Sequence, residues 1–136
     1  MNQIIVKSDK KNLNIVLSKI NEALEKHNPP MKSRLQLEMA IEELFVNICS
    51  YAYPDEGDIV IQYCVEDNSL KVIVNFIDND IPFNPLEKEE PDLSLGVEER
   101  EIGGLGLTLV RKNVDSLDYK YENNYNILTL EKNLGV

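Results

Sequence analysis

Glu43 and Asn47 stand four residues apart in AIEELFVNICSYAYP, a stretch that is otherwise mainly apolar. On a helix this spacing stacks both side chains on one side. If the carboxylate and the amide are partly buried, each needs a partner, because an unpaired buried polar group costs about 1 to 3 kcal/mol. The alternative is a pair that lies along the solvent edge of the helix. The spacing alone leaves both interpretations open.

Asp78 and Asp80 end the apolar part of VNFIDNDIPFNP, and two prolines follow them. Paired acids at a strand end can hold a metal ion, accept a hydrogen bond from a ligand amino group, or build a turn. An aspartate that binds the amino group of adenine needs an apolar wall beside it for the ring. Phe83 is the candidate for that wall, and an Asx turn is the structural alternative.

Three glycines in IGGLGLTLV stand just before and within the first turn of a predicted helix: Gly103, Gly104 and Gly106. Glycines at this place let the backbone approach phosphate oxygens, and a helix N-terminus offers free N–H groups. A tight connection is again the alternative. The segment lacks the Lys-Ser/Thr end of a P-loop and the preceding strand of a Rossmann fingerprint.

The elements that position these residues follow from the spacing of apolar side chains and from the turn residues. The predicted elements are a strand at 2–7, a helix at 13–24, a helix at about 33–51, strands at 58–66 and 70–78, a loop at 85–103, a helix at 105–117, and strands at 117–123 and 125–132. Their order predicts a two-layer α/β sandwich, with helices on one face of a mostly antiparallel sheet.

The second predicted helix carries Glu43 and Asn47. Ser33 is its expected N-cap and Pro54 its expected stop. Apolar residues such as Leu35 lie outside its main apolar stripe, so we expect this helix to be buried nearly all round.

The composition limits the classes of function. The 136 residues predict a single domain, 1–136. With 14 Lys and Arg against 24 Asp and Glu, the formal charge is −10, which argues against binding to nucleic acid or an anionic membrane. No apolar run suits a membrane span or a secretory signal, so the expected location is cytoplasmic. Cys49 and Cys64 lie among apolar neighbours and are expected to be core thiols.

Taken together and in order, the three motifs are similar to the N box, G1 box, ATP lid and G2 box of the GHKL (histidine kinase-like) ATPase superfamily. Within it, AIEELFVN followed by YAYP, then PFNPL, then GGLGLTLVRKNVD resemble the anti-sigma factor serine/threonine protein kinases of bacteria. The resemblance covers nearly the whole chain from the second helix onward. It implies the Bergerat ATP-binding fold, with ATP and Mg²⁺ as ligands.

The resemblance also implies roles for the helix residues. Asn47 matches the asparagine that coordinates the Mg²⁺ bridging the ATP phosphates. Glu43 matches the general base, which takes the proton from a serine hydroxyl of a partner protein as that hydroxyl attacks the γ-phosphate. Glu42 points about 100° away on the helix and is expected to be structural.

The remaining site residues follow from the same resemblance. Asp78 matches the aspartate that binds the adenine amino group, beside Phe83. The phosphates are expected to meet Gly104 and Gly106, with Gly103 at the hinge of an ATP lid at about 85–104. Arg100 lies near the end of that lid, where it either reaches the γ-phosphate or is solvated.

Two departures from the family pattern stand out. The third place of the D-x-G motif holds Asp80, which puts in question the backbone freedom and close approach that glycine supplies. The threonine that relatives carry in the final strand, linked to the adenine-binding aspartate, is replaced by Ile127, with Thr129 nearby.

The function expected from the resemblance is that of an ATP-dependent anti-sigma factor type serine/threonine protein kinase, which phosphorylates a small antagonist (anti-anti-sigma) protein and regulates transcription. The implied partners are that antagonist, a sigma factor and a second copy of the chain in a homodimer. Two alternatives stay open: a non-catalytic, nucleotide-gated module that sequesters a regulatory partner, and an ATPase module that serves another chain.

Overall fold

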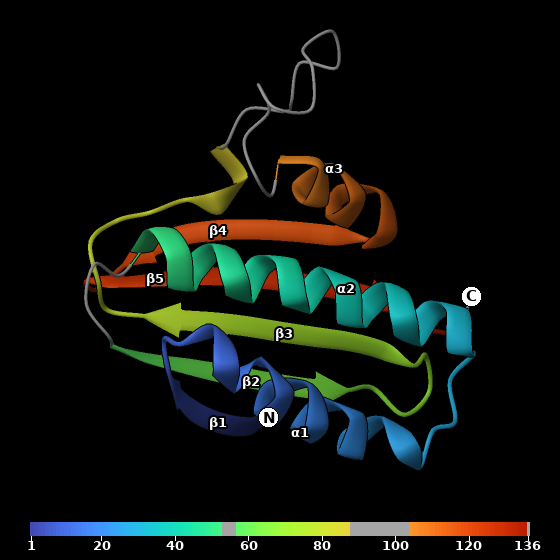
Figure 1. Cartoon of the computed structure of the whole chain (residues 1–136). Coiled ribbons are helices and arrows are strands. Elements are labelled where there is room, and N and C mark those ends of the chain that lie inside the picture. Colours follow the sequence, from blue (N-terminus) through green and yellow to red (C-terminus); the bar gives the residue numbers. More distant parts are fainter. Residues whose placement is uncertain (53–56, 88–103, 136) are drawn as a thin grey trace, which may run out of the picture.

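The computed structural model describes residues 1–52, 57–87 and 104–135 (Figure 1). The described elements, in chain order, are β1 (Asn2–Lys7), the 3₁₀ turn η1 (Lys10–Asn12), α1 (Leu13–Glu25), α2 (Met31–Asn47), the π-helical turn η2 (Ile48–Ala52), β2 (Asp58–Val65), β3 (Lys71–Asp78), the 3₁₀ turn η3 (Pro85–Glu87), α3 (Gly104–Asn113), β4 (Ser116–Glu122) and β5 (Tyr125–Asn133).

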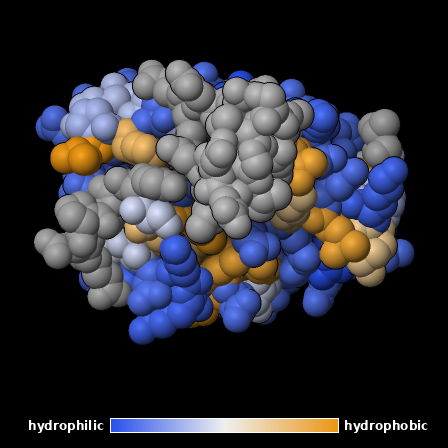
Figure 2. Space-filling view, turned by 45° about the horizontal axis from the view of Figure 1, so that its top comes forward, coloured by the Kyte–Doolittle hydropathy of each residue, from blue (hydrophilic) through white to orange (hydrophobic). Residues whose placement is uncertain are grey.

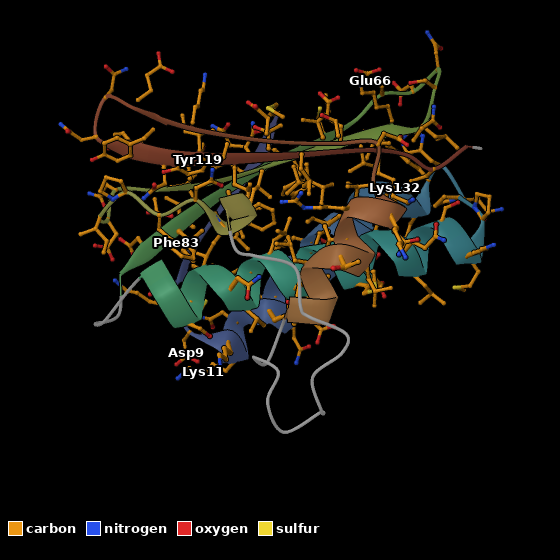
Figure 3. The ribbon with its side chains drawn as sticks, turned by 90° about the horizontal axis from the view of Figure 1, so that it is seen from above. Asp9, Lys11, Glu66, Phe83, Tyr119 and Lys132 are labelled. Carbon is orange, nitrogen blue, oxygen red and sulfur yellow. The ribbon has the colours of Figure 1, made fainter. Side chains whose placement is uncertain are left out.

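The strands form one five-stranded sheet in the order β1-β2-β3-β5-β4, and every neighbouring pair is antiparallel. All three α-helices lie on one face of this sheet (Figures 1 and 3). In β2, β3 and β5 the residues that face the helices are buried and alternate with partly exposed residues on the other face. The predicted two-layer α/β sandwich is therefore confirmed.

The start of α2 differs from the prediction. The helix begins at Met31, with Pro30 as its N-cap, and the N–H of Arg34 donates to the carbonyl of Pro30 at 3.1 Å. Ser33 is not the N-cap; it lies within the first turn and is buried. A proline suits a helix start because its missing N–H would have no partner there.

The surroundings of α2 also differ from the prediction. Its sheet-facing residues are buried, but the side chains of Met31 and Leu35 are 65% and 54% exposed. The helix therefore has a solvent side and is not buried all round. Its α-helical bonding ends at Asn47 and continues as the π-helical turn η2, which includes the predicted last residue, Tyr51. The predicted stop at Pro54 lies outside the described residues.

α3 is shorter than predicted, since it ends at Asn113 and not at residue 117. The apolar residues that extended the helical spacing, Val114 and Leu117, pack against the core from the connection and from β4. Lys132, buried on β5, donates from Nζ to the carbonyl of Asn113 and lies between the sheet and α3 (Figure 3). A cation at the C-terminus of a helix is stabilising, because it lies beside the partial negative charge of the last carbonyl groups. Burial lowers the pKa of Lys132.

Both predicted hairpins are confirmed. β2 pairs with β3, and β4 pairs with β5 through Asn123 and Asn124. These two asparagines have φ angles of 54° and 68°. Two residues with positive φ match the type I′ turn that suits the twist of a hairpin, and asparagine tolerates this conformation better than most residues.

The surface on the side where α3 lies is mainly hydrophilic, with smaller hydrophobic patches between the polar residues (Figure 2). Within the described ranges, no helix has the length and apolar character needed to cross a membrane. Cys49 and Cys64 are free and half-buried, and Cys49 packs against the core. Cys64 is not the expected core thiol, because it lies on the face of β2 away from the helices. Burial raises the pKa of the Cys49 thiol to about 11, as expected for a core thiol.

Candidate functional site

α2 and β3 end at the same end of the molecule, on the left of Figure 1. Asn47 is the last residue of α2 and Asp78 the last residue of β3. α3, which begins at Gly104, packs against α2 on the same face of the sheet. The fold therefore brings the helix motif and the strand-end motif to one end of the helical layer.

Asn47 is buried, with 4% of its surface exposed. Its Nδ2 has no hydrogen-bond partner in the described part of the chain. An unpaired buried amide costs about 1 to 3 kcal/mol, so a bound group that accepts from Nδ2 would recover free energy. The solvent-edge alternative is wrong for this residue.

Glu43 lies one helical turn before Asn47 and is partly buried, with its Oε1 shielded from solvent. The neighbouring Glu42 is exposed. The two adjacent glutamates therefore differ in their surroundings as the sequence predicted. Only Glu43 lies on the side of the helix that also holds Asn47.

Asp78 is buried, with 5% of its surface exposed. Its Oδ1 accepts hydrogen bonds from the backbone N–H of Asp80 at 3.2 Å and from Nδ2 of Asn126 at 2.8 Å. The first bond forms an Asx-type turn, the structural alternative that the sequence left open for Asp78. No hydrogen bond within the described residues reaches Oδ2, so this oxygen remains available to accept from a ligand.

Burial raises the pKa of Asp78, and the negative charge of Asp80 adds to the increase. The hydrogen bonds from Asn126 and from the Asp80 backbone act in the opposite direction, because they stabilise the charged form. The fold thus removes the Asp78 carboxylate from water, and its hydrogen bonds offset only part of the desolvation cost. Such a group is a typical candidate for a functional site.

Asn126, on β5, is the centre of the hydrogen bonds around Asp78. It lies directly opposite Asp78 in the register of β3 and β5 and is 4% exposed. Besides Asp78, its Nδ2 donates to the carbonyl of Ile81 at 2.9 Å. Its Oδ1 accepts from the N–H of Phe83 at 3.0 Å and from the hydroxyl of Tyr119 at 2.5 Å. One side chain therefore joins β3, β4, β5 and the segment after β3.

The sequence prediction missed Asn126, because it placed the position linked to the aspartate one residue later. Ile127 pairs with Ile77, and its side chain lies on the face of the sheet away from the helices. Thr129 lies on that face too, where its hydroxyl donates to Oδ1 of Asn75 at 2.8 Å. The signal that would have identified Asn126 is the strand register, which places a buried amide opposite Asp78.

Asp80 does not need the backbone freedom of glycine. Its own Oδ1 accepts from the N–H of Ile81 at 2.7 Å, which tightens the turn after β3. The described non-glycine residues with positive φ are Asn28, Leu70, Asn123 and Asn124. Since Asp80 is not one of them, the aspartate adopts this turn without strain in the left-handed region.

Phe83 lies at the same end of the sheet as Tyr119, as Figure 3 shows. It is partly buried and packs against the core, while its N–H is held by Asn126. Phe83 follows Asp78 closely in sequence, and both residues are hydrogen-bonded to the side chain of Asn126. This arrangement suits a wall beside a planar ligand.

The glycine motif is described in part. Gly104 and Gly106 form the first turn of α3, as predicted. Gly103, Arg100 and the predicted lid after Glu87 lie outside the described residues. The two glycines in the first turn of α3 give a ligand access to the free N–H groups at this end of the helix.

Comparison with known proteins connects this geometry to a family. The sequence profile of the histidine kinase-like ATPase domain matches residues 6–132, which includes all of the site described above. The chain belongs to the histidine kinase-like ATPase family. Membership implies that the chain binds ATP.

A curated relative within this range is the serine/threonine-protein kinase BtrW of Bordetella bronchiseptica. It is 27% identical over 97 residues, which cover 71% of this chain and 68% of BtrW. A protein similar to this chain is thus named as a protein kinase.

Two solved structures share the fold. The RsbU and RsbW domains of a Mycobacterium tuberculosis protein match with a TM-score of 0.64 and 14% identity, over 98% of this chain and 33% of that one. The histidine kinase domain of a blue-light activated histidine kinase from Erythrobacter litoralis matches with a TM-score of 0.56 and 15% identity, over 92% of this chain and 60% of that one. The chain therefore spans about a third and about 60% of these two proteins.

Proposed function

We propose that this histidine kinase-like ATPase domain is a protein serine/threonine kinase of the anti-sigma factor type, which transfers the γ-phosphoryl group of ATP to a small antagonist protein. The observation that carries the proposal is the pair on α2: a partly buried carboxylate, Glu43, one turn before a buried amide, Asn47, at the same end of the fold as Asp78. The similarity to BtrW and to a protein with an RsbW domain supports it.

Asp78 and its neighbours would bind the adenine. Oδ2 of Asp78 is the free acceptor for the exocyclic amino group, since Oδ1 already accepts two hydrogen bonds. Asn126 fixes both Asp78 and the backbone of Phe83, so the acceptor and the apolar wall keep a constant relative position. Holding such groups in place before the ligand arrives reduces the entropy that binding costs.

Glu43 would act on the protein substrate. In the transfer step, the oxygen of a serine or threonine hydroxyl forms a bond to the γ-phosphorus and the bond from that phosphorus to the β–γ bridging oxygen breaks, releasing ADP. The hydroxyl proton passes to the Glu43 carboxylate. The first turn of α3, with Gly104 and Gly106, would offer backbone N–H groups to the phosphates. Arg100, which precedes this turn in sequence, would neutralise charge that develops on the γ-phosphate.

Asn47 would hold Mg²⁺ through Oδ1. Its amide oxygen is the kind of hard ligand that Mg²⁺ takes, and in nucleotide sites one or two protein ligands suffice because phosphates and water supply the rest. The described residues contain no cluster of three or more His, Cys, Asp or Glu side chains that could hold a metal ion. When bound, Mg²⁺ neutralises charge on the phosphates.

The partners follow from the same proposal. The substrate would be an anti-anti-sigma type antagonist, and a sigma factor would be the second partner, bound by a homodimer in the cytoplasm. Regulation of transcription would then result from a switch between the two partners.

The experiment combines the purified chain, γ-labelled ATP, Mg²⁺ and a small antagonist protein encoded beside it. We expect the label on a serine or threonine of the antagonist, and a rate of labelling about 100- to 10,000-fold lower when Glu43→Gln replaces the wild type. Hydrolysis of ATP without labelled antagonist would instead indicate an ATPase module that serves another chain.

A nucleotide-gated binding module is the second candidate. It is motivated by Asp80, which stands where the family motif has glycine. ATP-dependent capture of the partner without any turnover would support this candidate over the kinase.

A further inference from the structure

Arg111, in the last turn of α3, reaches across to the segment that follows Asp78. Its Nη2 donates to the carbonyl of Leu86 at 2.5 Å, although the two residues are 25 apart in sequence. Leu86 belongs to η3, and Arg111 is exposed. A hydrogen bond from a charged donor is among the stronger ones in proteins.

The backbone of Leu86 is held from both sides. Its N–H donates to Oδ1 of Asn84 at 2.9 Å, while its carbonyl accepts from Arg111. Three residues earlier, the N–H of Phe83 is held by Asn126. The segment from Asp78 to Leu86 is thus fixed to the sheet at one end and to α3 at the other.

A pocket of ≈ 400 Å³ lies between η3 and the corner where α3 leads into β4. It is lined by Leu86, Arg111, Val114, Asp115, Ser116 and Leu117. Leu86, Val114 and Leu117 each pack against the core beside this pocket, and the Arg111–Leu86 hydrogen bond links η3 directly to α3.

We propose that Arg111 is a positioning residue, which holds the segment after Asp78 against α3 and so keeps the adenine end and the phosphate end of the nucleotide site in register. The inference rests on the proposed function, because it needs Asp78 and the start of α3 to bind one nucleotide. α3 is a rigid connection between the bond at Arg111 and the glycines at its first turn. Loosening the tie lets the two ends move independently, and bound nucleotide then dissociates faster.

The test compares Arg111→Met with Lys112→Met in the full chain. Both variants lose one exposed positive charge from the last turn of α3, but Lys112 makes no such tie to η3 in the described structure. The first measurement is hydrogen exchange of the backbone amides of Phe83 and Leu86 without nucleotide. We expect about tenfold faster exchange in Arg111→Met and wild-type exchange in Lys112→Met.

The second measurement is the dissociation rate of a fluorescent ADP analogue. We expect Arg111→Met to dissociate about tenfold faster with little change in association rate, because loss of one contact acts mainly on dissociation. Arg111→Lys retains a hydrogen-bond donor, so its dissociation rate should lie between those of the wild type and Arg111→Met. The thermal midpoint should change little, because Arg111 is exposed.

The outcomes separate this inference from the proposed function. Unchanged amide exchange, or faster exchange with unchanged nucleotide dissociation, would show that Arg111 does not position the site. Equal effects of Arg111→Met and Lys112→Met would assign the effect to charge, which also overturns the inference. A wild-type chain that binds no adenine nucleotide would instead overturn the proposed function, and the inference with it.

Discussion

Nδ2 of Asn126 lies 2.8 Å from Oδ1 of Asp78, and the two residues face each other across β3 and β5 although 48 residues separate them in sequence. The same amide holds the backbone of Phe83 and the hydroxyl of Tyr119. The buried carboxylate is therefore oriented by a residue of another strand, and no hydrogen bond within the described residues reaches its second oxygen.

Replacing Asn126 with Ala should weaken both the fold and the site. The change removes the hydrogen bonds that Asn126 makes to the N–H of Phe83 and to Oδ1 of Asp78, and Asp78 keeps only the bond from the N–H of Asp80, so the free energy of unfolding should fall by about 1 to 3 kcal/mol. ATP affinity should fall about tenfold, since Asp78 loses its fixed orientation. Denaturant titration and calorimetric titration with ATP measure the two effects.

Thr129→Val is the matched control for Asn126→Ala. Thr129 lies on the same strand but on the face of the sheet away from the helices, where it bonds to Asn75. We expect a loss of about 1 kcal/mol or less and unchanged ATP affinity. Equal loss of ATP affinity in both variants would mean that Asn126 acts only through overall stability.

Asp78→Asn should raise stability near neutral pH. Burial raises the pKa of Asp78, so the folded carboxyl binds a proton more tightly than the unfolded one. This contribution stabilises the fold fully below the unfolded pKa, about 3.9, and is lost as pH rises through the folded pKa. An asparagine side chain carries no charge to desolvate, so the thermal midpoint of the variant should exceed that of the wild type at pH 7, with a difference that shrinks toward pH 4. A difference that does not vary with pH would contradict this explanation.

The same substitution should abolish the adenine contact. The variant side chain would present an amide N–H₂ where Oδ2 of Asp78 now accepts, so two donors would face each other. We expect ATP affinity to fall about 10- to 100-fold, which corresponds to the loss of one hydrogen bond to a charged group. In the wild type, ATP binding should weaken as pH falls through the raised pKa of Asp78, because a protonated carboxyl offers one acceptor fewer. GTP, which lacks the adenine amino group, serves as the comparison ligand.

Much of the fold could be predicted from the sequence, because strand alternation and helical spacing report which residues face a core. The errors occur where tertiary contacts override the local pattern. α3 stops at Asn113, and the partly buried Val114 and Leu117 pack against the core from the connection and from β4. α2 starts at Met31 because Pro30 serves as its N-cap. Spacing alone does not distinguish an apolar residue on a helix from one that packs on the same core after the helix ends.

The site was predictable where its parts are close in sequence. The four-residue spacing of Glu43 and Asn47 and the position of Asp78 at a strand end are local signals. Asn126 was missed because its partnership depends on strand register, and a shift of one residue moves a side chain to the other face. Whether residue 80 needs the backbone freedom of glycine also could not be decided from sequence, because only the backbone angles show that Asp80 does not adopt a positive φ.

Glu43→Gln should separate catalysis from binding. Gln keeps the size of the side chain but accepts a proton poorly, so phosphoryl transfer to the antagonist should fall about 100- to 10,000-fold while ATP affinity changes little. The measurement is single-turnover transfer of labelled phosphate. Glu42→Gln is the control, since Glu42 is exposed on another side of the helix and should retain the wild-type rate. Equal loss in both variants, or none in Glu43→Gln, would remove Glu43 from the role of base.

Asn47→Ala should make nucleotide binding insensitive to magnesium. If Oδ1 of Asn47 holds Mg²⁺, the variant should bind Mg·ATP about tenfold more weakly than the wild type, whereas the two should bind ATP with similar affinity in EDTA. The fold should lose less stability than a buried side chain normally contributes, because Ala removes an Nδ2 that has no partner among the described residues. Titrations with ATP in Mg²⁺ and in EDTA, together with the thermal midpoint, test both statements. An equal loss of affinity in Mg²⁺ and in EDTA would show that Asn47 contacts the nucleotide or shapes the site, and would withdraw its assignment to the metal.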